Sequence, residues 1–60
     1  MYITNDKFTP MDYGEPIYSI IHKEYSEYGK DMYYWMKNEK DPSDVIYLSE
    51  GCLKNHYNKL

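Results

Sequence analysis

His22, Cys52 and His56 are the residues whose types could bind a metal ion or supply a nucleophile with its base. Cys52 and His56 are four positions apart, so a helix would place them on one face and within reach of one ion. Structural zinc, however, needs four ligands at recurrent close spacings, and a catalytic Cys-His pair needs an orienting third group and a cleft. The sequence has neither pattern. We therefore expect no metal, no cofactor and no catalytic residue, and we predict that the protein is not an enzyme.

Acidic residues form a second pattern near the middle of the chain, at Glu24, Glu27 and Asp31. Residues on a strand rise about 3.3 Å each, close to the roughly 3.4 Å of axis per phosphate on one DNA strand, so acids along a sheet can imitate a duplex backbone. Lys23 and Lys30 alternate with these acids, which favours a mixed solvated surface. The chain also resembles small phage inhibitors of uracil-DNA glycosylase in length, tyrosine content and acidity. This resemblance implies an alternative function, the inhibition of a host DNA-handling enzyme by DNA mimicry.

The densest aromatic stretch spans residues 33–36. On a strand, Tyr33 and Trp35 share one face while Tyr34 and Met36 share the other, so one pair must lie outside the core or under a partner. Tyrosine and tryptophan are enriched at the hot spots of protein interfaces, and flanking acids can orient a partner. The predicted partner-binding residues are Tyr28, Tyr33, Tyr34, Trp35 and Met36, with the acids Glu24, Glu27 and Asp31.

The composition limits the function classes further. A chain of sixty residues fits one small domain, residues 1–60. Its net charge of -3, its pI of about 5.1 and its lack of arginine predict that it does not bind nucleic acid directly. The single cysteine excludes an internal disulfide and favours a reducing cytoplasm. No apolar run approaches the ~20 residues of a membrane span, and the first residues lack the blocks of a signal peptide. We expect a cytoplasmic protein with no membrane partner.

Residues 16–37 fit two local structures. Apolar residues at spacings of three and four would form one stripe of a helix: Ile17, Ile21, Tyr25, Tyr28, Met32 and Trp35. The alternative is a hairpin, with strands at residues 16–25 and 32–37 and a turn at residues 26–31. The sequence favours the hairpin because β-branched and aromatic residues dominate both halves, and because Gly29 inside a helix would cost about 1 kcal/mol.

The remaining segments carry clearer local signals. Pro10 and Gly14 predict an extended, looped start, with a short strand only at residues 2–4. Residues 40–44 read as a turn, and residues 45–48 as a third strand. Ser49 can cap a short C-terminal helix with an apolar edge at Leu53, Tyr57 and Leu60. So short a helix would not stand alone, so Leu53 and Tyr57 must dock on the sheet. The predicted fold is mainly β, either an antiparallel sheet of three to five strands or an SH3-like barrel, with this short helix.

Three segments resemble short SH3-like barrel proteins of Gram-positive phages and prophages: the run Gly14-Glu15-Pro16-Ile17-Tyr18-Ser19-Ile20, the hairpin around Tyr28-Gly29-Lys30, and the ending Val45-Ile46-Tyr47-Leu48-Ser49-Glu50 with Leu53 and Tyr57. The resemblance implies a fold and a source, and it transfers no catalytic residue. With the aromatic excess and the acidic balance, it suggests a small phage or mobile-element protein that binds and inhibits a host protein. A structural homo-oligomer, which would complete the core of so short a chain, is the other alternative.

Overall fold

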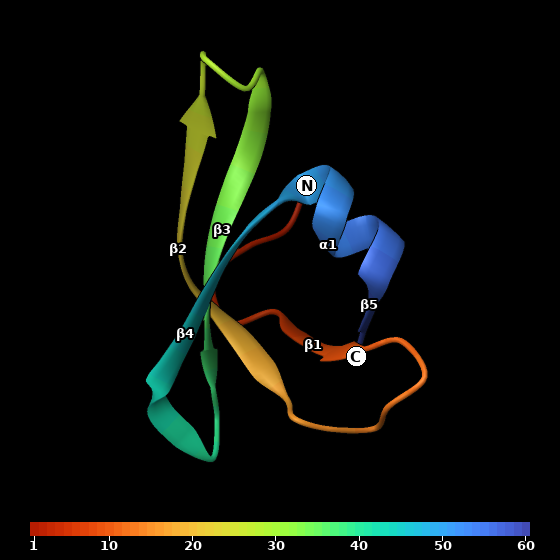
Figure 1. The fold of residues 1–60 in the computed structure, drawn as a ribbon. Helices are drawn as coiled ribbons and strands as arrows, with labels where there is room; N and C mark the ends of the chain where they lie inside the picture. The colour runs from red at the N-terminus through yellow and green to blue at the C-terminus, as the bar shows by residue number, and fades with distance from the viewer.

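Five strands and one short helix follow one another in the computed structural model, which describes residues 1–60 (Figure 1). The elements are β1 (Lys7–Pro10), β2 (Tyr18–Ser26), β3 (Asp31–Asn38), β4 (Asp41–Ser49), α1 (Glu50–His56) and β5 (Tyr57–Lys59). Strands β1 to β4 form an antiparallel meander, and α1 then leads to β5, which pairs with β1. The sheet order is β4-β3-β2-β1-β5, so β4 and β5 are the edges of an open sheet.

The predicted hairpin is confirmed, and the alternative helix over residues 16–37 is wrong. β2 and β3 pair along most of their length, from Tyr18 opposite Asn38 to Ser26 opposite Asp31. The connecting turn holds Gly29, where an added Cβ would lie 2.8 Å from the hydroxyl oxygen of Tyr33. A glycine at this position therefore lets the Tyr33 ring approach the turn closely.

A β-bulge interrupts β2 between Ile20 and His22. Tyr18 and Ile20 are buried on the face that carries the core, while Ile21 is 43% exposed. The extra residue reverses the alternation, so His22 becomes the neighbour of Trp35 on the opposite face. Figure 1 shows β2 bending sharply near its middle.

The core lies between one face of the sheet and α1. Its buried apolar residues come from three strands and the helix: Phe8, Tyr18, Ile20, Tyr34, Met36 and Leu53. Ser49 is the N-cap of α1 as predicted, since its side chain accepts a hydrogen bond from the Cys52 N–H at 3.2 Å. Leu53 docks on the sheet with no exposed surface, which confirms the predicted contact of the helix. With seven residues, α1 is too short to cross a membrane.

Both ends of the chain differ from the prediction. Residues 2–4 form no strand, and β1 lies instead at Lys7–Pro10, inside the segment that was expected to loop. The helix ends at His56, before Leu60, because Tyr57 turns extended and pairs with Pro10. Each of these two short strands supplies the backbone partners of the other, a long-range pairing that has no local sequence signal.

The turn after β3 also lies earlier than predicted. It occupies Glu39 and Lys40, and β4 already begins at Asp41, so Pro42 lies within a strand. Proline is tolerated there because β4 is an edge strand, on which a missing N–H can face solvent. Of the two predicted architectures, the structure therefore has the open sheet with a short C-terminal helix.

Candidate functional site

The outer face of the sheet, opposite α1, carries a row of aromatic side chains. His22, Trp35 and Tyr47 are direct cross-strand neighbours on β2, β3 and β4. Their ring centroids lie 4.9 Å apart for His22 and Trp35, and 4.4 Å apart for Trp35 and Tyr47. Tyr33 completes the group by stacking on Tyr47, with centroids 5.1 Å apart and ring planes 19° apart. We call these four residues the aromatic face.

No helix or strand covers the aromatic face, and its rings are shielded mainly by one another. Tyr47 remains 53% exposed, while Tyr33 and Trp35 are half-buried. Aromatic pairs in such geometries contribute about 0.5–1.5 kcal/mol each beyond the apolar area that they bury. The contacts hold the rings in place before any partner arrives, so their ordering would cost little on binding.

The rim of the aromatic face is polar and carries both signs of charge. Glu24 lies beside Tyr33 in the sheet, and its Oε1 is 3.1 Å from Nε2 of His22. Lys37, on β3, is flanked by Ser19 on β2 and by Val45 on β4, which is 44% exposed. An apolar centre with a polar rim is the usual composition of a protein interface.

The predicted partner-binding residues divide between the two faces. Tyr33 and Trp35 lie on the aromatic face, whereas Tyr34 and Met36 have no exposed surface. Assigning Tyr34 and Met36 to a partner surface was therefore wrong. The alternation of β3 turns both side chains toward α1, and they are part of the core under that helix.

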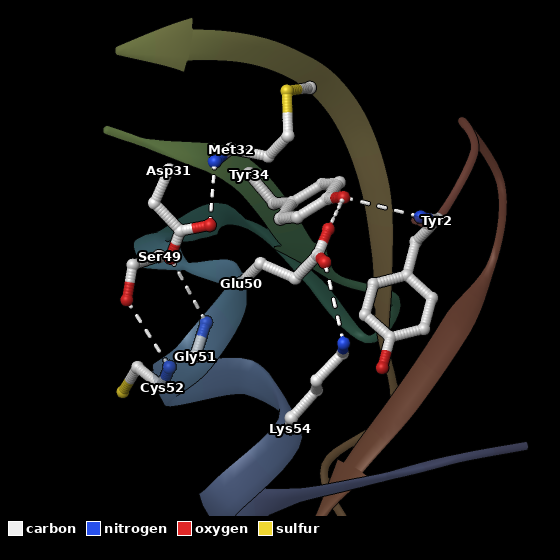
Figure 2. A network of polar contacts seen from close by, with 9 residues as sticks. All are labelled: Tyr2, Asp31, Met32, Tyr34, Ser49, Glu50, Gly51, Cys52 and Lys54. Atoms are coloured by element: carbon white, nitrogen blue, oxygen red, sulfur yellow. Dashed lines mark hydrogen bonds and ion pairs between the residues drawn. The ribbon is translucent and has the colours of Figure 1, made fainter. Parts of the chain in front are cut away.

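The other predicted site residues are spread along the β2–β3 hairpin. Glu24 borders the aromatic face, while Glu27 and the fully exposed Tyr28 lie in the turn, away from it. Asp31 serves the fold instead: its carboxylate accepts hydrogen bonds from the Met32 N–H at 2.8 Å and from the Gly51 N–H at 3.3 Å (Figure 2). The three acids therefore form no continuous row.

Sequence reasoning missed His22 and Tyr47. Tyr47 lies in a strand that was predicted, but the cross-strand register that aligns it with Trp35 has no local signal. His22 reaches the outer face only through the bulge in β2. A strict alternation from Ile20 would have placed His22 in the core.

A polar network on the inner face fixes α1 against the sheet (Figure 2). The buried hydroxyl of Tyr34 donates a hydrogen bond to Glu50 Oε1 at 2.5 Å and accepts one from the Tyr2 N–H at 3.2 Å. Burial, reinforced by this contact, raises the pKa of Tyr34 to about 12, and the same hydrogen bond lowers the pKa of Glu50. Lys54 adds an ion pair with Glu50 at 3.5 Å.

A second buried tyrosine ties β2 to the edge strand. The hydroxyl of Tyr18 donates to Asp44 Oδ2 at 2.9 Å, and Asn38 donates to the same oxygen at 3.2 Å. Burial, together with the nearby carboxylate, raises the pKa of Tyr18 to about 12. These hydrogen bonds hold the start of β4 against β2 and β3.

No cluster of His, Cys, Asp or Glu side chains in the structure could hold a metal ion. The one cleft lies between residues 14–17 and residues 38–40, and Ile17 is the one hydrophobic residue among the seven that line it. Comparisons with protein families, curated proteins and solved structures find no match for this chain. The aromatic face is therefore the strongest candidate for a functional site.

Proposed function

We propose that the protein is a small protein-binding module, a phage or mobile-element protein that binds and inhibits a host protein through its aromatic face. The observation that carries the proposal is the uncovered row formed by His22, Trp35 and Tyr47, extended by Tyr33. Buried aromatic anchors supply much of the energy of protein interfaces, and a polar rim excludes water around them. A partner that covers Tyr47 would bury the exposed half of its ring.

The resemblance to short SH3-like phage proteins remains part of this proposal. In that group a strand ends in a short helical turn, and here β4 runs directly into α1 through the cap at Ser49.

DNA mimicry is less well supported as the inhibitory mechanism. Several acids are already paired with lysines within the protein: Glu39 with Lys7, Glu50 with Lys54, and Glu15 with Lys40. Paired acids present a weaker negative field than the regular phosphates that they would have to imitate. We therefore assign partner recognition to the aromatic rings and treat competition by duplex DNA as a test of the alternative.

Affinity capture from a Gram-positive bacterial lysate tests the proposal. The tagged protein should retain one stoichiometric host protein, and Trp35→Ala and Tyr47→Ala should each lose it while circular dichroism shows the same fold. Tyr13→Ala is the matched control, because Tyr13 is a 71% exposed aromatic residue in a loop and its recorded hydrogen bonds come from its main chain. Purifying the captured protein then allows its activity to be measured with and without the chain.

Three results would contradict this assignment. Capture that survives both aromatic substitutions would remove the aromatic face as the binding site. Displacement of the partner by duplex DNA would favour mimicry. Recovery of the bait alone, at a size larger than a monomer, would favour a homo-oligomer.

A further inference from the structure

The edge strand β4 leaves a long stretch of backbone without a partner. Only β3 pairs with it, and none of the seven backbone hydrogen bonds outside the helix and strands involves residues 41–49. In an antiparallel pair, alternate residues point their N–H and C=O groups away from the neighbouring strand. Residues 45–49, which are in register with β3, therefore present free donors and acceptors along their outer side, whereas Pro42 has no N–H and the Ser43 N–H donates to Asp41 Oδ1.

The second half of this edge lacks the usual protection against strand pairing. Residues 45–48 are Val, Ile, Tyr and Leu, and they include no charge and no proline. The opposite edge, β5, differs because it has three residues and includes Lys59. Natural sheets shield their edges with short strands, lysines and prolines, so an apolar four-residue edge is open to pairing.

The aromatic face extends to this same edge. Tyr47 and Val45 are 53% and 44% exposed on its outer side, and Ile46 and Leu48 lie partly buried on the inner side. An added strand would alternate its side chains between the two faces. The side chains on its outer side would extend the aromatic face beyond Tyr47, and the side chains on its inner side would contact Ile46 and Leu48.

The start of β4 adds a charge preference. Asp41 accepts hydrogen bonds from Ser43 only, and Asp44 accepts them from Tyr18 and Asn38, all of which are neutral donors. Neither carboxylate forms an ion pair, and β4 contains no lysine. A basic side chain on the incoming strand would therefore find an unpaired negative charge at this end.

The same charges disfavour a second copy of this chain as the added strand. Antiparallel pairing of two β4 strands about Ile46 would place Asp44 opposite Leu48 and Pro42 opposite Glu50 of the other copy. Asp41 would then approach the acidic start of the neighbouring α1. The arrangement brings acids together and supplies no cation from β4.

We infer that the β4 edge takes up an extended segment of a protein partner, with apolar residues at alternate positions and a lysine or arginine at the end that meets Asp41. The inference rests on the proposed function and specifies how the partner is bound. Main-chain hydrogen bonds to β4 give affinity, and the aromatic face together with Asp41 gives side-chain preference.

Amide hydrogen exchange on the complete, isotope-labelled protein tests this inference with a synthetic peptide. The peptide alternates Val and Thr and carries two Lys at its C-terminal end, which antiparallel pairing would bring beside Asp41. Saturable binding should slow exchange severalfold at the β4 amides that point away from β3 and leave the β5 amides unchanged. A peptide N-methylated at alternate positions cannot donate to the edge and should give no protection.

The preference for a basic residue beside Asp41 is tested with one protein variant and one peptide variant. Asp41→Asn keeps the acceptor for Ser43 and should weaken binding of the Lys peptide about two- to fivefold. A peptide with Glu in place of Lys should bind more weakly than the Lys peptide to the unsubstituted protein. Equal binding of both peptides would overturn the charge assignment.

Three outcomes would overturn the edge assignment itself: no β4 protection at millimolar peptide, equal protection by the N-methylated peptide, or protection that rises with protein concentration alone and so indicates a second copy. If Trp35→Ala abolishes host-protein capture but β4 stays unprotected, the edge assignment fails and the proposed function stands. If the peptide protects β4 but no host protein is captured, the proposed function fails and the edge assignment stands.

Discussion

Replacing Tyr34 with phenylalanine should destabilise the fold through one hydroxyl group. The ring of Tyr34 is fully buried and would keep its contacts in Tyr34→Phe. The lost oxygen, however, donates to the Glu50 carboxylate and accepts from the Tyr2 N–H (Figure 2). The substitution therefore leaves two partly buried polar groups without that partner and weakens the link between β3 and α1.

The expected loss of stability is large for so short a chain. A hydrogen bond to a charged group contributes about 1.5–3 kcal/mol, and the orphaned Tyr2 N–H adds to the cost. A chain of this length has a total free energy of unfolding of roughly 3–9 kcal/mol. Each kcal/mol lowers the midpoint temperature of a small domain by about 4–8 °C, so we expect a decrease of about 10 °C or more.

Urea and thermal unfolding, followed by the fluorescence of the single tryptophan and by circular dichroism, measure this loss. Tyr33→Phe is the matched control, because the Tyr33 hydroxyl has no hydrogen-bond partner within the protein, and it should change stability by no more than about 0.5 kcal/mol. Equal midpoints for the two variants would refute the role assigned to the network around Tyr34.

The same variant should also change the acid dependence of stability. The hydrogen bond from Tyr34 lowers the pKa of Glu50, so Glu50 stabilises the fold above its unfolded pKa of about 4.3, and this stability is lost as pH falls through the lowered value. Without the Tyr34 hydroxyl, the pKa of Glu50 should move back toward its ordinary value. The stability of Tyr34→Phe should therefore fall less steeply with acid, and an unchanged slope would contradict the pKa assignment.

Three further outcomes follow from the core and the cap. The pKa values of Tyr18 and Tyr34 are raised to about 12, so the stability that these residues contribute is present below about pH 10 and is lost as pH rises toward 12. The absorbance of their tyrosinate forms should therefore appear only as the protein unfolds. Titration of both residues near pH 10 in the folded protein would contradict the raised pKa values. Ser49→Ala should cost about 1 kcal/mol in urea unfolding because Cys52 loses its cap acceptor, whereas no change would refute the cap. Leu53→Ala should cost about 2–5 kcal/mol in urea unfolding, and a loss of no more than about 0.5 kcal/mol, as expected for a surface position, would refute its place in the core.

The elements that local chemistry specifies could be predicted from the sequence. The β2–β3 hairpin follows from its β-branched and aromatic residues and from Gly29, and the start of α1 follows from Ser49. β1 and β5 could not be predicted, because they form by pairing Phe8 with Lys59 across the whole length of the chain. That pairing depends on where α1 leads the chain after β4 rather than on local propensity.

The aromatic face could be predicted only in part. Alternation separates Tyr33 and Trp35 from Tyr34 and Met36, but it does not say which pair lies under α1. That choice depends on the side of the sheet over which the chain passes between β4 and β5. Local signals also could not reveal the bulge that brings His22 next to Trp35.

The small size of the chain explains why one face of the sheet is covered by α1 while the other face is left uncovered. One seven-residue helix can cover only one face, and the aliphatic residues available for a second layer are few. The outer rings consequently shield each other: Tyr33 stacks on Tyr47, and Trp35 packs between Tyr47 and His22. Mutual packing of this kind accounts for the buried half of Tyr47 but leaves the other half in water, at the edge where β4 has free backbone groups. A partner strand would satisfy both, and this coincidence supports the proposal that the β4 edge and the aromatic face act as one binding site.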